Sequence, residues 1–176
     1  MNVKKTKFKG ILLFNKKSFS DTRGYFREIF KKNYLKKNFK FEYLSLSKKN
    51  VIRGLHIQTK KPQGKFITVL KGKIFDIALD LRKNSKTFGK CHSIILSGYK
   101  NQSIYIPEGF AHGFCTLEND TLMHYNCTEY RDIKSENGIQ WNDSDLKIQW
   151  PAQDPIVSMK DRKNLNLKDF KKKFLK

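Results

Sequence analysis

Residues 63–82, QGKFITVLKGKIFDIALDLR, contain two apolar runs on either side of Gly72. Both runs are rich in Ile, Val, Leu and Phe and are bounded by polar residues, which is typical of β-strands. A glycine between two strands marks a tight turn. The stretch therefore predicts a β-hairpin whose turn is built on Gly72.

The same pattern continues toward the C-terminus as far as about residue 150. Short apolar segments alternate with turn residues such as Gly98, Pro107 and Gly109. A succession of short strands with little helix favours an all-β sandwich or barrel, and a jelly roll in particular. The segments expected to be strands are HSIILS (92–97), QSIYIP (102–107), GFCTL (113–117), TLMHYNCTEY (121–130), GIQWND (138–143) and KIQW (147–150).

Both ends of the chain depart from this pattern. In the N-terminal part, residues 18–46 suggest a turn at Asp21–Gly24, a segment with helical periodicity and a strand near 41–46. At the C-terminus, Phe170, Phe174 and Leu175 recur at helical spacing, which predicts a docked amphipathic helix. With no internal repeat and no Pro- or Ser-rich linker, we expect one domain over residues 1–176.

Composition narrows the class of protein. No apolar run approaches the length of a membrane span, and the start, MNVKKTKFKGILLF, lacks a signal-peptide core, so we expect a cytoplasmic location. The three cysteines form no CxxC pair, which argues against a disulfide framework or a zinc knuckle. The net charge of +21 comes mostly from lysines spread along the chain, a pattern more typical of a solvated surface than of a nucleic-acid site.

His56, in RGLHIQ (53–58), can be interpreted as a metal ligand, a buried structural group or a catalytic base. The metal interpretation lacks a third ligand beside His56 and His112, so we expect no metal site. The structural interpretation is weakened by the polar groups nearby, because Arg53, Gln63 and Lys65 are costly to bury unless they face a pocket. A polar pocket inside the predicted barrel is the more economical interpretation.

Two other candidates have simple structural explanations. Tyr125 lies in TLMHYNCTEY, where alternation places Met123, Tyr125 and Cys127 on one face, and spacing alone favours a core aromatic. Asp161, in VSMKD, fits the first turn of a helix, where a carboxylate complements the helix dipole.

Several motifs taken in order resemble the dTDP-4-dehydrorhamnose 3,5-epimerase family, a branch of the cupins. They are RGLHIQ (53–58), QGKFITVLKGKIFDIALDLRKNSKTFGK (63–90), IPEGFAHGF (106–114), IQWND (139–143) and IQWP (148–151), between SDTRGYFRE near the start and SMKD near the end. The resemblance implies a cupin jelly roll, a homodimer, a nucleotide-sugar substrate and no metal or organic cofactor. It also implies inversion at C3 and C5 of a 4-keto-6-deoxy sugar, whose ketone acidifies the hydrogens on both neighbouring carbons.

The resemblance also implies a role for each matching residue. His56 corresponds to the family's base, Asp161 to the carboxylate that orients and balances it, and Tyr125 to the proton donor on the opposite face. Lys65, with help from Arg53, corresponds to the cation beside the enolate oxygen. The remaining positions correspond to substrate contacts: Gln63, Asp76 and His112 at the pocket, and Arg23 with Glu28 at the nucleotide diphosphate.

The chain departs from the family pattern at the substrate end of the site. Phe41, Glu42, Tyr43 and Leu44 replace a stretch that carries polar Gln and Asn residues in many members, and Arg131 replaces an aromatic. The implied substrate is therefore open between a dTDP-linked hexose and a GDP-linked heptose, and between inversion at one centre and at two. The alternatives are a nucleotide-sugar 3,4-ketoisomerase and a non-catalytic sugar-nucleotide or nucleic-acid binding module.

Overall fold

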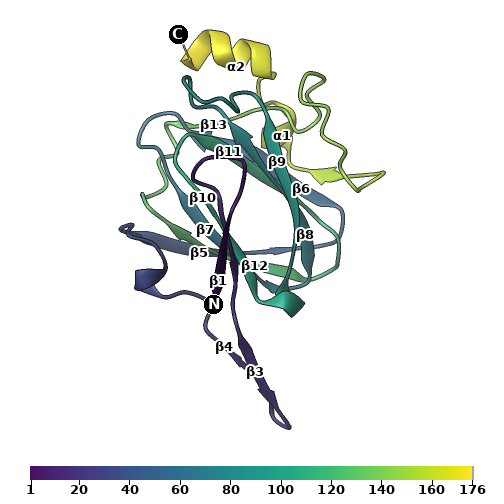
Figure 1. Ribbon diagram of the computed structural model, residues 1–176. Coiled ribbons are helices and arrows are strands. Elements are labelled where there is room, and N and C mark those ends of the chain that lie inside the picture. Colours follow the sequence, from purple (N-terminus) through teal and green to yellow (C-terminus); the bar gives the residue numbers. More distant parts are fainter. Residues whose placement is uncertain (176) are drawn as a thin grey trace.

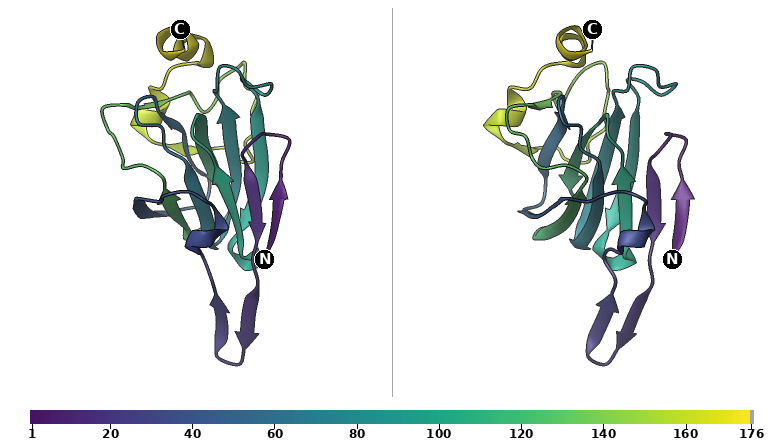
Figure 2. Two further views of the ribbon diagram at one scale, coloured as in Figure 1. Left: turned by 60° about the vertical axis from the view of Figure 1, so that its left-hand side comes forward. Right: turned by 90° about the vertical axis from the view of Figure 1, so that its left-hand side faces the viewer.

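The computed structural model describes residues 1–175 and is built on two six-stranded β-sheets, which lie as two layers in Figure 2. Every pairing between neighbouring strands is antiparallel except that of β14 with β6. The first sheet has the order β1 (Asn2–Lys5), β2 (Leu12–Asn15), β10 (Gln102–Ile106), β7 (Lys65–Lys71), β12 (Thr121–Cys127) and β5 (Phe41–Ser47). The second has the order β13 (Glu136–Gly138), β6 (Val51–Gln58), β11 (Phe110–Thr116), β8 (Lys73–Asp80) and β9 (Cys91–Ser97), with β14 (Ile156–Val157) beside β6. The predicted all-β jelly roll is confirmed.

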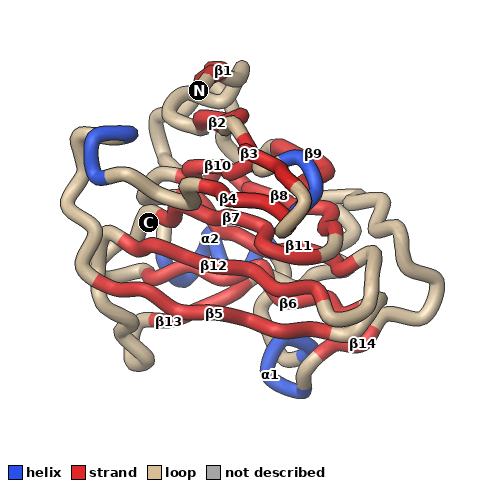
Figure 3. Tube along the Cα trace, turned by 90° about the horizontal axis from the view of Figure 1, so that it is seen from below, coloured by secondary structure: helices blue, strands red, loops and turns tan. Residues whose placement is uncertain are grey.

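The main core lies between the sheets and follows from the alternation of the strands. On β12, Met123, Tyr125 and Cys127 point inward and are almost fully buried, as their spacing predicts. The neighbouring strand β7 contributes Ile67 and the facing strand β11 contributes Phe114 to the same cluster. In the first sheet, β5, β12 and β7 run side by side (Figure 3). A residue on the inner face of one of these strands is therefore close to its neighbours on the next.

The predicted hairpin at Gly72 is wrong. β7 belongs to the first sheet and β8 to the second, so Gly72 turns the chain from one layer to the other. Its φ of 81° is in the left-handed region that favours glycine, and a Cβ there would collide with Thr121. A glycine with positive φ suits both a hairpin turn and a connection that passes from one sheet to the other. The local sequence therefore does not distinguish the two.

The helical segment expected after Gly24 is also wrong. Residues 18–27 form a separate two-stranded hairpin, β3 (Ser18–Asp21) and β4 (Gly24–Arg27), which projects from the body in Figure 1. Only a short 3-10 helix, η1 (Lys32–Tyr34), follows. The aromatic rings that gave the helical spacing instead pack on the outer face of the first sheet, where Phe30 and Phe39 meet Phe66 edge-on.

The segment KIQW (147–150), expected to be a strand, is an extended loop. Its Trp150 packs on the second sheet, where the indole lies edge-on to Phe75 and donates to the Trp141 carbonyl at 2.7 Å. Over four residues, a strand and a loop held by one large buried ring can have the same pattern of apolar and polar residues.

Helices are few and short: η2 (Gly98–Lys100), α1 (Met159–Arg162) and α2 (Leu167–Phe174). The predicted C-terminal helix is confirmed as α2, which covers the outer face of the second sheet with Leu167 and Phe170 and lies at the end opposite the β3–β4 hairpin (Figure 1). Within residues 1–175, no helix has the length and apolar character needed to span a membrane.

Candidate active site

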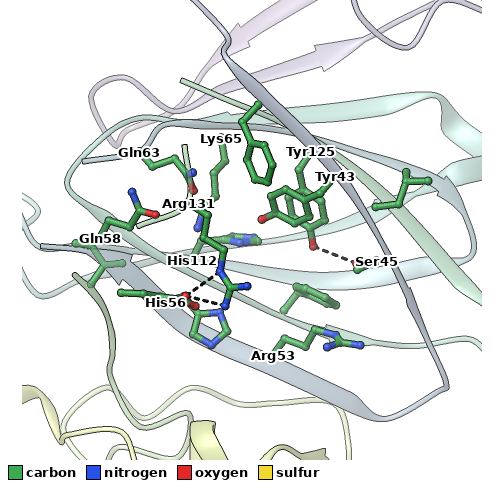
Figure 4. A pocket seen from close by; sticks show the side chains of 15 residues that line it. Tyr43, Ser45, Arg53, His56, Gln58, Gln63, Lys65, His112, Tyr125 and Arg131 are labelled. Atoms are coloured by element: carbon green, nitrogen blue, oxygen red, sulfur yellow. Dashed lines mark hydrogen bonds and ion pairs between the residues drawn. The ribbon is translucent and has the colours of Figure 1, made fainter. Parts of the chain in front are cut away.

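A pocket of about 380 Å³ opens between the two sheets. Strands β5, β7 and β12 line it from the first sheet, and β6 and β11 line it from the second (Figure 4). Of the residues singled out in the sequence, Arg53, His56, Gln63, Lys65, His112 and Tyr125 line this pocket.

An irregularity in β6 brings two of these residues to the pocket. Arg53 and His56 are three residues apart, yet both line it, because the register between β6 and β11 shifts beside Gly54. Gly54 has a φ of 129°, and a Cβ there would lie 2.5 Å from the Gly113 Cα. Two glycines, Gly54 and Gly113, therefore allow the close contact between β6 and β11.

His56 and Asp161 form a hydrogen-bonded pair. His56 Nε2 lies 2.6 Å from Asp161 Oδ1, and the Gly54 N–H donates to the other carboxylate oxygen at 3.2 Å. The His56 side chain is 29% exposed and that of Asp161 is 4% exposed. Burial opposes ionisation of Asp161, but the hydrogen bond and charge of His56, the Gly54 N–H and the Ser158 side chain hold its pKa below the ordinary value. An ionised Asp161 accepts the Nε2 proton, which leaves His56 Nδ1 as the basic nitrogen.

Helix α1 places Asp161 at this position. Ser158 caps the helix by accepting from the Asp161 N–H at 3.1 Å, so Asp161 lies in the first turn, as the sequence indicated. The same residue thus has both the structural role and the pairing with His56.

A second histidine and aspartate pair lies deeper. His112 Nε2 is 2.7 Å from Asp76 Oδ2, and the two side chains are 6% and 1% exposed. His112 stands opposite His56 in the register of β11 and β6. Asp76 lies behind His112 and does not line the pocket itself.

Lys65 is the innermost cation of the pocket. Burial lowers the pKa of its ammonium group. Within residues 1–175, Lys65 Nζ has neither an ion pair nor a hydrogen bond. A desolvated cation of this kind is strongly stabilised by negative charge that develops beside it.

Tyr125 faces the pocket from the first sheet. Its side chain is 3% exposed, and burial raises the pKa of its hydroxyl, which therefore stays protonated at neutral pH. The hydroxyl has long contacts with Ser45 Oγ at 3.4 Å and Met123 Sδ at 3.5 Å. Because Tyr125 lies on the first sheet and His56 on the second, the two face the pocket from opposite layers (Figure 4).

Besides Asp76, two further expected substrate contacts, Arg23 and Glu28, are not in the pocket. Arg23 lies at the turn of the β3–β4 hairpin, where its 88% exposed side chain pairs with Asp21 at 2.6 Å. Glu28 pairs with Lys31 at 2.5 Å on the chain that follows the hairpin. Neither residue lines the pocket.

Other lining residues were not proposed as site residues from the sequence. The alternation of β5 turns Phe41, Tyr43 and Ser45 inward, a signal that was available once residues 41–47 were taken as a strand. Glu136 had no such signal, because it lies on the three-residue strand β13. It forms ion pairs with Arg131 at 2.9 Å and Lys160 at 2.9 Å.

The arrangement suits acid and base chemistry on a neutral carbon acid. It combines an imidazole backed by a carboxylate, a buried ammonium and a protonated phenol. Among residues 1–175, no cluster of three or more His, Cys, Asp or Glu side chains is suited to hold a metal ion.

The similarity of the chain to known proteins extends over most of its length. The family model described as dTDP-4-dehydrorhamnose 3,5-epimerase matches residues 5–169. The enzyme of that name from Methanothermobacter thermautotrophicus is 43% identical over 166 residues, which cover 90% of each chain.

Two solved structures share the fold. The 3,5-epimerase of Legionella pneumophila, in complex with dTDP-4-keto-L-rhamnose, has a TM-score of 0.91 at 37% identity and covers 95% of this chain and 93% of its own. The dTDP-4-dehydrorhamnose 3,5-epimerase of Bacillus anthracis, with TDP and pyrophosphate bound, has a TM-score of 0.90 at 38% identity and covers 94% of this chain and 99% of its own.

Proposed function

The chain belongs to the dTDP-4-dehydrorhamnose 3,5-epimerase family of isomerases, and from this we propose that it epimerises C3, C5 or both of a nucleotide-linked 4-keto-6-deoxy sugar. The preferred substrate is a dTDP-linked hexose, because the relatives with ligands contain dTDP-sugar or TDP. A GDP-linked 4-keto-6-deoxyheptose is the other substrate to test. The observation that carries the proposal is that His56 and Tyr125 face one pocket from opposite sheets.

In the proposed mechanism, His56 Nδ1 removes the hydrogen from the carbon beside the C4 ketone. The electron pair moves onto the ketone oxygen, and the Lys65 ammonium, with Arg53 at the same pocket, stabilises the enolate. Tyr125 then donates its hydroxyl proton to the opposite face of the carbon, which inverts the centre. Asp161 holds the His56 ring and balances the charge that it acquires. No cofactor is required by this sequence of steps.

The proposal includes a homodimer. Arg23 and Glu28 lie outside the pocket of their own chain, so they can bind a nucleotide diphosphate as the resemblance implies only if the hairpin packs against a second copy. The exposed rings of Phe19, Tyr25 and Phe26 on the same hairpin support such packing, since they are 59%, 61% and 69% exposed.

We place the enzyme in the cytoplasm, in the synthesis of a surface polysaccharide, and expect neither a nucleic-acid partner nor a membrane partner. The supporting argument is chemical, because activated sugars with a 4-ketone are intermediates of polysaccharide building blocks. Steeply salt-dependent binding to DNA or RNA would contradict this part of the proposal.

The first experiment is hydrogen exchange in D2O. The protein is incubated with dTDP-linked and GDP-linked 4-keto-6-deoxy sugars, a hexose and a heptose, while the C3 and C5 proton signals are followed by NMR. Loss of the signals with inverted product supports the proposal and identifies the nucleotide. A product with a shifted ketone and unchanged C5 would instead indicate a 3,4-ketoisomerase, and no exchange with any substrate would contradict the proposed activity.

The matched variant is His56→Asn, which we expect to abolish exchange while the protein stays folded. Retained exchange at C3 and C5 would remove His56 from the mechanism. In Tyr125→Phe, inversion should slow more than hydrogen loss, because proton abstraction does not need the acid; an equal loss of both rates would contradict this division of roles.

A further inference from the structure

Tyr43 lies flat against Tyr125. The ring centroids are 4.3 Å apart and the ring planes differ by 11°, and the two rings overlap in Figure 4. The residues are direct partners in the register of β5 and β12. This is a cross-strand aromatic pair, and both members line the pocket.

Ring packing holds Tyr125 more firmly than hydrogen bonds do. The contact of its hydroxyl with Ser45 Oγ, at 3.4 Å, is at the long limit of hydrogen bonding, and the contact with Met123 at 3.5 Å is to a thioether sulfur, which is a weak acceptor. On the side chain's other flank, the His112 ring lies edge-on with its centroid 6.4 Å away. Of the two ring contacts that Tyr125 makes within residues 1–175, the stack on Tyr43 is therefore the closer, and it faces the plane of the Tyr125 ring.

We infer that Tyr43 is a positioning residue for Tyr125 and holds its hydroxyl where it can deliver a proton to the substrate carbon. The inference rests on the proposed function, in which Tyr125 is the proton donor. It concerns a position where the chain carries an aromatic in place of the polar side chain common in the family it resembles.

The ring of Tyr43, rather than its hydroxyl, is the part that acts. Stacking needs only the flat face, which phenylalanine also provides. Without that face, the Tyr125 ring gains freedom to rotate, and a displacement of about 1 Å in a catalytic group can lower a rate about 100-fold. His56 lies on the other sheet and is held by Asp161, so proton abstraction does not depend on the stack.

A loose Tyr125 thus has a specific consequence. After His56 removes the hydrogen, the enolate persists until Tyr125 donates a proton to the opposite face of the carbon. If that proton is slow to arrive, His56 returns a solvent-derived hydron to the original face, and the carbon exchanges without inverting. The ratio of exchange to inversion therefore measures the placement of Tyr125, and a general loss of stability does not change this ratio.

The test compares Tyr43→Phe, Tyr43→Leu and Tyr43→Ala in D2O with the substrate that the wild-type protein turns over. NMR gives the rate of deuterium incorporation at C3 and C5 and the rate of inverted product. We expect Tyr43→Phe to stay within about twofold of wild type in both rates. In Tyr43→Leu and Tyr43→Ala, inversion should fall about 10- to 100-fold while exchange falls less than about threefold.

Three outcomes would overturn the inference. An unchanged ratio in the leucine and alanine variants would show that the stack does not position Tyr125. If inversion slowed as much in Tyr43→Phe as in Tyr43→Leu, the effect would belong to the hydroxyl of Tyr43 and not to its ring. If exchange and inversion fell by the same factor in a folded Tyr43→Leu protein, the effect would belong to the pocket as a whole. Failure of the proposed function looks different, because the wild-type protein itself would then show neither exchange nor inversion.

Discussion

Asp161 contacts two groups of β6, the His56 ring and the backbone N–H of Gly54. Asp161→Asn keeps the size of the side chain but places an amide where the ring needs an acceptor, which favours the wrong tautomer of His56. By analogy with catalytic triads, kcat should fall about 100- to 10,000-fold with little change in KM. Steady-state kinetics of product formation measures both constants.

The matched control is Asp154→Asn, because Asp154 is exposed and lies outside this pocket. It should retain wild-type kinetics. If Asp161→Asn also kept wild-type kcat, the carboxylate would have no part in catalysis and the pair would be structural.

Arg131 adds positive charge at the opening of the pocket that a nearby carboxylate only partly neutralises. Its side chain is 56% exposed and shares Glu136 with Lys160, so one carboxylate lies between two cations. The sugar must enter far enough to meet Tyr125, which leaves the diphosphate nearer the mouth. Arg131→Ala should therefore raise KM about 10-fold, the effect of one charge-assisted hydrogen bond, with kcat nearly unchanged.

Lys134→Ala is the control for charge, because Lys134 is exposed, lies three residues away and does not line the pocket. Its KM should match that of the wild-type enzyme at physiological salt. Equal shifts in KM for the two variants would mean that Arg131 acts only through the overall field of the protein.

The sequence predicted which residues line the pocket better than it predicted contacts between different strands. Lys65, His56 and Tyr125 were recognised by type and motif, and all three line the pocket. The pairing of His112 with Asp76 joins β11 to β8 at 2.7 Å, a contact between strands that alternation within one strand does not specify. Glu136 could not be found from the sequence, because its role depends on ion pairs to residues on two other segments.

At the scale of elements, the end of β8 is fixed by a buried carboxylate. Asp80 is 0% exposed and accepts from Arg82 at 2.7 Å, Ser85 at 2.5 Å and Thr87 at 2.6 Å. Burial opposes its ionisation, but these donors lower the pKa of Asp80 to about 2 from 3.8. The folded state therefore favours the ionised form, and this stabilisation is present above about pH 4 and lost as the pH falls toward 2.

The shift corresponds to about 2 kcal/mol, at about 1.4 kcal/mol per pKa unit. We expect Asp80→Asn to lower the free energy of unfolding at pH 6 by at least about this amount and to flatten its decline between pH 4 and 2.5. Urea denaturation across this range measures both effects. Asp145→Asn, at an exposed aspartate, should follow the wild-type curve, and a parallel decline in Asp80→Asn would show that other carboxylates cause it.

The elements that the sequence predicted wrongly share a physical cause. Short apolar runs between turn residues identified most strands from residue 65 onward, because these strands are largely buried. The ring spacing in residues 25–40 suggested a helix, but Phe30, Tyr34 and Phe39 dock individually on Phe66 and need no helical backbone to do so, while Tyr25 and Phe26 stay exposed. The turn at Gly72 was recognised, but a turn residue does not specify which strand the next one pairs with.

At the scale of the whole molecule, the β3–β4 hairpin is the feature that a single copy does not explain. It projects from the body in Figure 1 and has three exposed aromatic rings. Strand β5, at the edge of the first sheet, has Leu44 and Leu46, which are 58% and 62% exposed. A monomer gains nothing by leaving these side chains in water. In a symmetric dimer each hairpin can cover its partner, and Arg23 can then complete the partner's pocket.

This arrangement predicts complementation between two inactive proteins. His56→Asn removes the base, and Arg23→Ala removes the hairpin contact, so each homodimer should have little activity. In a mixed dimer, the pocket of the Arg23→Ala chain keeps His56 and receives an intact hairpin from the other chain. If subunits mix at random in equal amounts, half the dimers are mixed and half their pockets are competent, so about one quarter of wild-type activity should return. Sedimentation velocity should show that the wild-type protein and both variants have the mass of two chains. Activity of the mixture no greater than the mean of the two separate variants would show that each pocket uses residues of its own chain alone.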